Sequence, residues 1–419
     1  PIRRYKMKKT FFKLLVIMTA ISCFWLAACS RPAVKDQARL FKEDLEFLQA
    51  RTGVIVLSAR DGQAMVAINP DIQGRVMTST AKGPEGLSFG WINQELIASG
   101  QSDPHMNAFG GEDRFWLGPE GGQFALFFKA GSPFDFDHWF TPPPLNEGSF
   151  DLVTKDETQV VLKKDMNLVN YANFEFKIKV DRTIRLLDKN QVESLGVPLS
   201  DRLSWVAFES DNQITNTGDL PWKKETGLVS IWILGMFNPS PTTTVVVPYK
   251  AGPEAELGPI VHDTYFGPIP PDRLKIADNV IYFKGDGQYR SKLGIPPRRA
   301  LPFAGSYDAT HQVLTIVHYT LPENPAEYIN SLWEFQKDPY DGDVVNAYND
   351  GPVAPGAKPL GPFYELETSS PAAALNPGES LSHVHTTIHL QGEEKDLEPI
   401  ARKILGVSLE EIKQAFSQK

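Results

Sequence analysis

The sequence predicts an all-β fold, either a sandwich or a barrel of antiparallel strands. Short runs of β-branched or alternating residues, broken by Gly, Pro, Asp and Asn, recur at regular spacing from residue 53 onward, as in such folds. Residues 174–186 alternate almost ideally between apolar and polar side chains, which is typical of a half-buried antiparallel strand. The sequence shows no regular alternation of strands with long helices, so a parallel α/β sheet is not expected.

The composition is that of a globular protein with a large core. Of the 419 residues, 42% are hydrophobic and 22% are charged, which is ordinary for globular chains. The net charge is −9, and no long run of lysine or arginine occurs outside the N-terminus. Nucleic acid is therefore not an expected partner.

The N-terminus has the layout of a secretory signal. Lysines surround Met7, an apolar stretch covers residues 11–26, and the string Leu-Ala-Ala-Cys ends at Cys29. This string resembles a bacterial lipobox, which implies a signal peptide over residues 1–28, with 1–6 upstream of the true start, and lipidation of Cys29. A single transmembrane helix is the alternative, but the apolar stretch is short for one.

Cysteine usage and hydropathy agree with a tethered domain. The two cysteines are Cys23 and Cys29, so cleavage and acylation leave no thiol for a disulfide, a nucleophile or a metal site. No second apolar stretch is long enough to span a bilayer. We expect a lipid-anchored protein of the cell envelope, at the outer membrane and facing the periplasm or the cell surface, without a cofactor.

The expected elements follow the chain in order. Residues 29–52 form the lipidated tether and a short amphipathic helix over 36–50, and one β domain covers 53–395. The expected strands are 52–60, 63–70, 74–80, 89–97, 115–117, 124–128, 158–165, 174–187, 203–216, 227–234, 242–249, 279–285, 312–321 and 383–390. The C-terminal segment 396–419 is helical, with a break near 406–408 and a capping box formed by Ser408 and Glu411.

The stretch 110–128 is open to two interpretations. Its second glycine cluster, 118–122, is typical of a turn between two buried strands. Glu112, Asp113 and Arg114 come just before the expected strand 115–117. On this interpretation, a carboxylate and the neighbouring arginine form an ordinary surface ion pair. On the other interpretation, Arg114 supplies forked donors to a ligand in an aromatic-lined site.

Glu365 and Glu367 are the second candidate pair. Their spacing of two places both carboxylates on one face of a strand. A close pair of carboxylates raises the pKa of one of them, which would suit general acid–base chemistry. The alternative is a solvent-facing strand with two unremarkable glutamates.

Two histidine-containing segments are weaker candidates. His383, His385 and His389 share a strand face and suggest a metal site, but no carboxylate or fourth ligand accompanies them, so exposed strand histidines are favoured and no metal is expected. In the loop beginning at His262-Asp263, the pair is either a proton shuttle or a hydrogen-bonded anchor of the loop. The sequence has no P-loop, dinucleotide fingerprint, HExxH or GxSxG motif.

Several long strings resemble an uncharacterised family of secreted or lipidated proteins from Bacteroidetes, DUF6786. They are GGEDRFWLGPEGGQFALFF, TNTGDLPWKKETGLVSIWILGMF, VVVPYK, VHDTYFG and GPFYELETSSPAAALNPGESLSHVHTTIHL. The first string is the most specific, and together the strings cover nearly the whole mature chain.

A more distant similarity connects the chain to the galactose-mutarotase-like superfamily, which includes the aldose 1-epimerases. Leu366-Glu367-Thr368, then Pro371 and residues 375–379, match the order of an epimerase motif that supplies the catalytic base. The resemblance implies that Glu367 is this base, that Arg114 binds sugar, and that the fold is a large antiparallel β-supersandwich.

One departure from the epimerase pattern concerns the general acid. In epimerases a Thr-Asn string is followed by a motif whose histidine is the acid, but after Thr215-Asn216 this sequence has no histidine at that place. Mutarotation needs both an acid and a base. We take His262 as its replacement.

The sequence therefore predicts recognition of carbohydrate in a concave sheet face, with epimerase-like chemistry as one version. The alternatives are a non-catalytic glycan-binding lipoprotein and a purely structural envelope protein. Expected catalytic residues are Glu367 and His262. Expected substrate-binding residues are Arg114, Glu112, Asp113, Trp116, Lys250, Asp263, Tyr265 and Glu365, and Trp222 is a further candidate for stacking on sugars.

Overall fold

The computed structural model describes residues 38–417, apart from Pro325 and Pro355. The predicted signal peptide and the predicted lipidation site, Cys29, lie outside the described residues. No helix within the described part of the chain combines the length and the apolar character needed to cross a membrane.

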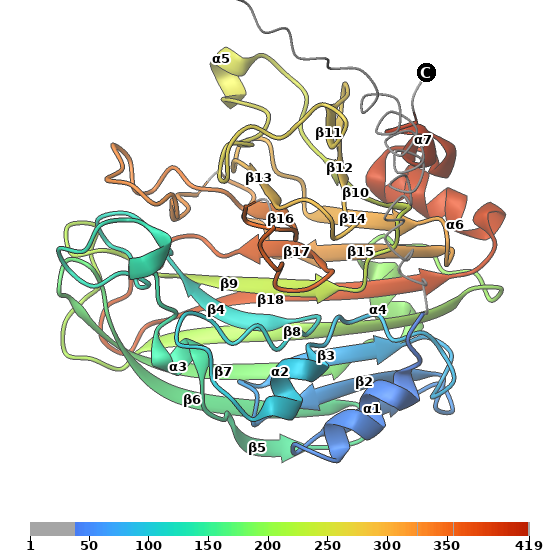
Figure 1. Ribbon diagram of the computed structural model, residues 1–419, viewed down its shortest axis with the longest axis horizontal. Helices are drawn as coiled ribbons and strands as arrows, with labels where there is room; N and C mark the ends of the chain where they lie inside the picture. Colours follow the sequence, from blue (N-terminus) through green and yellow to red (C-terminus); the bar gives the residue numbers. More distant parts are fainter. Residues whose placement is uncertain (1–37, 325, 355, 418–419) are drawn as a thin grey trace, which may run out of the picture. The chain divides into compact units, whose positions relative to one another are not determined.

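A ten-stranded antiparallel sheet forms the larger layer and runs from β11 at the top of Figure 1 to β5 at the bottom. Its strands, in spatial order, are β11 (Leu274–Ile276), β12 (Val280–Lys284), β10 (Thr243–Pro248), β14 (Phe303–Asp308), β15 (Val313–Tyr319), β18 (Ser380–Gln391), β8 (Ser204–Asn216), β7 (Glu175–Leu186), β6 (Gln159–Val169) and β5 (Asp151–Lys155).

A five-stranded antiparallel sheet packs on this layer and carries the candidate site. Its strands, in order, are β13 (Ser291–Ile295), β16 (Val345–Asn349), β17 (Tyr364–Ser369), β9 (Ser230–Phe237) and β4 (Arg114–Gly118). The two sheets meet through buried side chains: the Tyr364 and Ser306 hydroxyls hydrogen-bond at 2.8 Å, and Thr368 Oγ1 lies 2.9 Å from ring nitrogens of His383 and His385. The predicted all-β antiparallel sandwich is confirmed.

A small third sheet and short helices complete the fold. The sheet consists of β1 (Ile55–Ala59), β2 (Ala64–Asn69) and β3 (Arg75–Thr80). The helical segments are α1 (Phe41–Gln49), α2 (Gln94–Ser99), η1 (Phe136–His138), α3 (Pro143–Asn146), α4 (Lys189–Ser194), α5 (Glu254–Leu257), α6 (Glu394–Ile400), η2 (Ala401–Leu405) and α7 (Leu409–Gln414). The predicted helix over 36–50 is confirmed from Phe41 onward.

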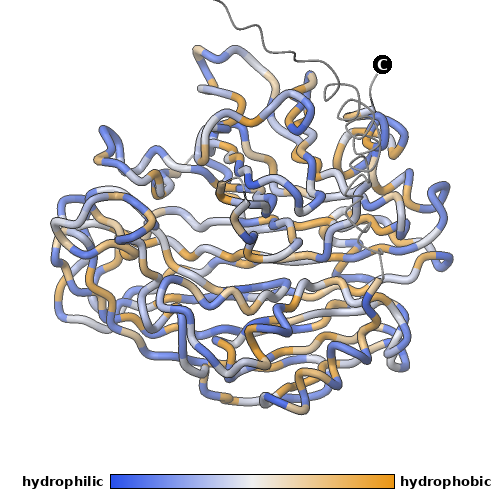
Figure 2. Tube along the Cα trace, viewed as in Figure 1, coloured by the Kyte–Doolittle hydropathy of each residue, from blue (hydrophilic) through white to orange (hydrophobic). Residues whose placement is uncertain are grey.

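Strand β7 shows how the sequence pattern produces the sandwich. Every second residue from Phe176 to Leu186 is buried, while the residues between them are exposed or half-buried. Because successive side chains on a strand point to opposite faces, β7 buries one face against the other layers. Figure 2 shows the same distribution more widely, with much of the hydrophobic colour along the strands and hydrophilic colour at many loop tips.

Two predicted strands are wrong. Residues 89–97 lead into helix α2 because the Asn93 side chain caps the amide of Leu96, and Gly100, at a φ of 61°, ends the helix. Residues 124–128 are largely buried but form no strand. The amides of Ala125 and Leu126 donate to Gly122 and Pro119, within the local turn, rather than to a neighbouring strand.

The C-terminal helices agree with the sequence. Gly406, in the left-handed region at a φ of 74°, separates η2 from α7. The Ser408 side chain accepts from the amide of Glu411, and the Glu411 carboxylate accepts from the amide of Ser408, which is the predicted capping box. These helices pack near β10 and β14 (Figure 1).

Candidate functional site

Glu365 and Glu367 lie side by side on strand β17, on the face directed away from the ten-stranded sheet. Tyr364 and Thr368 contact β14 and β18 on the inner face, and the alternation of the strand directs the two glutamates to the other face. Both are buried, with exposed fractions of 5% and 1%. They are therefore not the solvent-facing glutamates of the alternative interpretation.

Strand register brings two cations to the same face. Glu367 pairs with Leu234 of β9, and Leu234 pairs with Arg114 of β4. Likewise Glu365 pairs with Tyr348 of β16, which pairs with Lys292 of β13. Paired residues of antiparallel strands point to the same side, so side chains from distant parts of the chain meet here.

The four charged side chains form two ion pairs. Arg114 Nη2 lies 3.3 Å from Glu365 Oε1, and Lys292 Nζ donates to Glu367 Oε2 at 2.8 Å. The indole N–H of Trp232 donates to the same Glu367 oxygen at 2.9 Å. All four charged side chains are nearly inaccessible to solvent, and pairing offsets much of the cost of burying them. We call these four residues the charged cluster.

Two polar atoms of the charged cluster have no hydrogen-bond partner. They are Arg114 Nε and Glu367 Oε1, and both are buried. Buried polar atoms in folded proteins are generally hydrogen-bonded. Two unpaired atoms in one cluster therefore mark a site where a polar ligand can complete the hydrogen bonding.

The electrostatics of the cluster distinguish the carboxyl groups. Burial raises the pKa of Glu365; the guanidinium of Arg114 opposes this shift and the carboxylate of Glu367 adds to it. Burial also raises the pKa of the partly buried Glu120, and Lys292 opposes the shift. The pKa of Lys292 is raised because Glu367 and Glu120 outweigh the effect of its burial.

Aromatic side chains surround the cluster. The Arg114 guanidinium lies 4.0 Å from the ring centroid of Trp116, and Lys292 Nζ lies 4.8 Å from that of Trp232. The two indoles contact each other edge to face at 5.6 Å. These rings exclude water from the charges and so strengthen the electrostatic interactions among them.

His262 and Tyr265 approach the cluster through Asp343. Asp343 accepts from Tyr265 Oη on one oxygen and lies 2.9 Å from His262 Nδ1 on the other. Asn346, which is paired in register with Glu367, donates to Tyr265 Oη at 3.4 Å. The hydrogen bond to Asp343 raises the pKa of His262. The side chain of His262 is 38% exposed, so it lies at the outer side of this network.

Glu112 and Asp113 lie apart from the cluster, in the interior of the sandwich. Glu112 accepts from Ser79 and contacts the His389 ring at 2.9 Å. Asp113 pairs with Arg182. Of the three neighbouring residues that were predicted to bind the ligand, Glu112, Asp113 and Arg114, only Arg114 points toward Glu365.

Three other predicted residues also lie outside the charged cluster. Lys250 is exposed in the loop after β10, where its backbone pairs with Arg299. Asp263 is half-buried beside His262. Trp222 is buried in the core, with its ring 5.4 Å from Phe176, so no ring face is open for stacking.

The alternating histidines are buried, which corrects the expectation that they are exposed. His383 and His385 share the Thr368 hydroxyl, and His389 lies between Glu112 and Thr315. Their face is the inner one, so all three belong to the interior of the sandwich. Among the described residues, no group of three or more His, Cys, Asp or Glu side chains is arranged to hold a metal ion.

Sequence reasoning missed Lys292, Trp232, Glu120, Asn346 and Asp343. The available signal was Lys292 itself, a single cation in the short run Ser-Lys-Leu-Gly-Ile of β13, which is wholly buried. A buried lysine needs a nearby carboxylate. No pattern in the sequence, however, names Glu367 as that partner.

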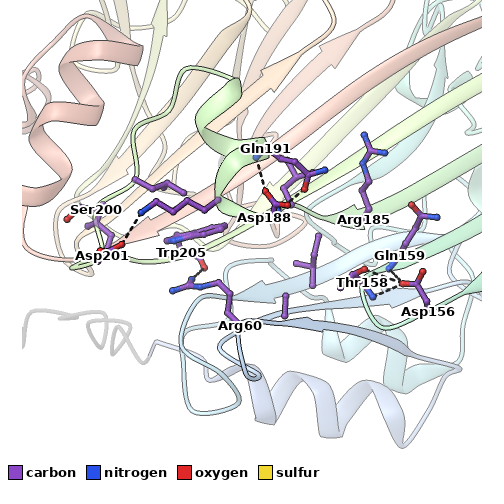
Figure 3. Close-up of a pocket in the computed structure, with 16 residues that line it drawn as sticks. Arg60, Asp156, Thr158, Gln159, Arg185, Asp188, Gln191, Ser200, Asp201 and Trp205 are labelled. Atoms are coloured by element: carbon purple, nitrogen blue, oxygen red, sulfur yellow. Dashed lines mark hydrogen bonds and ion pairs between the residues drawn. The ribbon is translucent and has the colours of Figure 1, made fainter.

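A cavity of about 810 Å³ lies elsewhere, around Trp205 and the start of helix α4 (Figure 3). Its polar groups have structural partners: Lys189 pairs with Asp201, Asp188 caps α4, and Asp156 accepts the amides of its own turn. A second cavity, of about 320 Å³, is lined by residues such as Thr52 and Asn107. Neither is lined by the charged cluster.

The chain belongs to a family of unknown function, DUF6786, whose model matches residues 39–416. The predicted family is thus confirmed. No curated protein matches the sequence.

Solved structures similar to the chain include galactose-mutarotase-like proteins. A protein from Synechocystis sp. PCC 6803 has a TM-score of 0.47 and 12% identity, over 82% of this chain and 97% of that one. A galactose mutarotase-like protein from Lactobacillus casei has a TM-score of 0.45 and 13% identity, over 81% and 100%. A GalM/aldose epimerase homologue from C. elegans has a TM-score of 0.45 and 10% identity, over 81% and 100%.

Proposed function

We propose that this DUF6786 member recognises a carbohydrate at the charged cluster and acts on it by acid–base chemistry of the aldose epimerase type. The observation that carries the proposal is the presence of two unpaired buried atoms, Arg114 Nε and Glu367 Oε1. Sugar hydroxyls both donate and accept hydrogen bonds and so match one N–H donor and one carboxylate oxygen. The surrounding indoles provide apolar area for the C–H faces of a sugar ring.

The reaction needs one proton acceptor and one proton donor. We assign Glu367 as the acceptor of the anomeric hydroxyl proton and Glu365 as the donor to the ring oxygen. The bond between C1 and the ring oxygen breaks, and an open-chain aldehyde forms. After rotation about C1–C2, the reverse proton transfers close the ring on the opposite face, and both carboxyl groups return to their starting states.

Glu365 is a better donor candidate than His262. Burial favours the protonated form of Glu365, and two carboxyl groups in different environments can divide the acid and base roles. His262 contacts Asp343, which in turn binds Tyr265. We therefore assign His262 to the positioning of Tyr265 rather than to proton transfer.

Replacement of Glu367 tests the chemistry. Glu367→Gln keeps the size of the side chain and removes the base, so we expect at least about a 100-fold loss in the rate of mutarotation of active aldoses. Polarimetry on freshly dissolved D-glucose, D-galactose, D-mannose and D-xylose measures this rate. Exposed Glu193→Gln is the matched control and should leave the rate unchanged.

Two results would contradict this assignment. A folded Glu367→Gln variant as active as the parent would remove Glu367 from the mechanism. A Glu365→Gln variant with full activity would return the donor role to another group. Circular dichroism spectra of each variant separate these results from unfolding.

Non-catalytic glycan binding is the second candidate function. The observation that favours it is the mutual pairing of the charges, Arg114 with Glu365 and Lys292 with Glu367. Charges held in this way can orient hydroxyl groups without exchanging protons. In that case, sugars would bind to the parent protein and bind less tightly to Arg114→Lys, while polarimetry would show no turnover of any aldose.

We further propose that Cys29 anchors the protein to the cell envelope through acyl chains, at the outer membrane. The Leu-Ala-Ala-Cys string supports this proposal. We expect the parent protein to fractionate with membranes and to incorporate radiolabelled palmitate, and Cys29→Ser to lose both properties. Ser30→Ala is the neighbouring control, and labelling of Cys29→Ser would refute the anchor.

A further inference from the structure

Five aromatic rings form a continuous stack next to the proposed site. Successive ring centroids lie 4.4 Å apart for Phe140 and His105, 4.8 Å for His105 and Phe136, 6.1 Å for Phe136 and Trp139, and 5.9 Å for Trp139 and Trp333. Neighbouring planes differ by 13° to 21°. We call these five residues the ring stack.

The inner end of the ring stack reaches the charged cluster. Trp333 and Trp139 interact with the carboxylate of Glu120, which in turn lies within electrostatic reach of Lys292 and Glu367. The ring of Trp139 also lies 5.7 Å from that of Phe127, which lies 5.1 Å from the Trp116 ring that packs against Arg114. The ring stack and the charged cluster are therefore continuous.

The outer end of the ring stack is open to solvent. Phe136 is 56% exposed and Phe140 is 39% exposed. Exposed aromatic area of this kind is unfavourable in water, and clusters of it commonly mark binding surfaces. His105 is held between the two phenylalanines, and its Nδ1 lies 2.6 Å from the carbonyl oxygen of Trp139. The rings are thus held in place before any ligand arrives, which lowers the entropic cost of binding.

The charges around the ring stack favour a neutral ligand. Asp103, Asp135 and Asp137 are all exposed beside it. Membrane-binding aromatic surfaces usually combine their rings with lysine and arginine, which attract anionic lipids, and polyanions are likewise repelled by carboxylates. Sugar rings are uncharged and present flat C–H faces that pack on aromatic rings.

We propose that the ring stack binds further sugar residues of an oligosaccharide whose terminal unit occupies the charged cluster. This inference rests on the proposed function and deepens it, because it names a glycan chain rather than a free monosaccharide as the natural ligand. The terminal sugar meets Glu365 and Glu367, and the following units extend past Glu120 over Phe136 and Phe140.

The dependence of affinity on chain length tests the inference. Isothermal titration calorimetry would compare gluco-, galacto-, manno- and xylo-oligosaccharides of one to six units. In at least one series, we expect the parent protein to bind the longer chains at least about tenfold more tightly than the monosaccharide, or about 1.4 kcal/mol. The double variant Phe136→Ala/Phe140→Ala should lose this gain and keep the monosaccharide affinity.

Two control variants isolate the role of the rings. Phe136→Tyr keeps a flat ring and should keep the gain. Ile276→Ala removes an apolar side chain of β11 whose exposure, 46%, lies between those of Phe136 and Phe140, and it should also keep the gain. Equal losses in Ile276→Ala and in the double variant would overturn the inference.

The possible failures are distinguishable. If monosaccharides bind and Arg114→Lys weakens them, but length has no effect in any series, the inference is wrong and the proposed function stands. If longer chains bind through Phe136 and Phe140 regardless of Arg114 and Glu367, the proposed site is wrong, and so is the placement of the terminal sugar. Binding to phosphatidylglycerol vesicles that disappears in the double variant would replace the glycan with a membrane.

Discussion

Asp113 and Arg182 form a fully buried ion pair inside the sandwich. Arg182 also donates to the backbone oxygen of Gly74 at 3.0 Å and to Asn212, while the second carboxylate oxygen of Asp113 accepts from Ser210 at 2.6 Å. Partners on every side allow such a pair to persist away from water. Asp113, which the sequence suggests as a ligand-binding acid, therefore has a structural role instead.

Removing one partner of this pair should destabilise the fold. Asp113→Asn leaves the Arg182 charge buried and unpaired, and we expect the free energy of unfolding to fall by about 3–5 kcal/mol. Urea denaturation followed by tryptophan fluorescence measures the change. Asp201→Asn, which breaks an exposed pair with Lys189, is the matched control and should leave the midpoint unchanged.

An unchanged midpoint for Asp113→Asn would mean that the interior tolerates the unpaired guanidinium. In that case, the pair contributes no net stability. If Asp113 instead bound substrate, as the sequence suggested, the variant would lose sugar affinity with its stability intact.

Strands with strict alternation and the capping box of α7 were predictable from the sequence, but the conformations of residues 89–97 and 124–128 were not. β7 is identified by its pattern alone, because half of its residues face the core. Residues 89–97 have strand-like composition, yet the cap at Asn93 and the αL residue Gly100 produce a helix. Residues 124–128 are as apolar as a strand, but their amides are engaged in a turn.

The candidate site was predictable on one strand and not across strands. The spacing of two between Glu365 and Glu367 fixes a shared face wherever β17 lies. Lys292 and Arg114 join them only through the order β13-β16-β17-β9-β4, and no spacing in the sequence encodes that order. The epimerase resemblance supplied Arg114, whereas no motif pointed to Lys292.

Across the whole molecule, a buried polar layer lies between the two sheets. It contains Asp113, Arg182, Glu112 and the three histidines of β18, together with the hydroxyl groups of Thr368 and Thr387. Burial lowers the pKa of His383 to about 3 and that of His385 to about 4. Arg182 also contributes to lowering the pKa of His385, whereas Asp113 opposes the shift.

This layer predicts acid sensitivity of the fold. In the unfolded chain histidine titrates near pH 6.5, so below that pH the unfolded state binds protons that the folded state does not. The free energy of unfolding should therefore fall as the pH drops from about 6.5 toward 4, by about 2 kcal/mol per histidine at pH 5. Glu365 and Asp350 have raised pKa values, so their protonation increases the free energy of unfolding as the pH falls. This contribution is the same in the parent and in every histidine variant.

The difference between variants isolates the histidine contribution. His383→Leu removes one of the two histidines with a lowered pKa. The slope of unfolding free energy against pH between 6 and 4.5 should therefore decrease, relative to the parent, by the contribution of about one bound proton. Urea denaturation at intervals of half a pH unit measures the slope, and the exposed His138→Gln serves as the control. Because His383 is buried between the sheets, its variant can be less stable at every pH and still confirm the prediction. Parallel stability curves for His383→Leu and the parent would instead show that His383 accepts a proton within the folded sandwich.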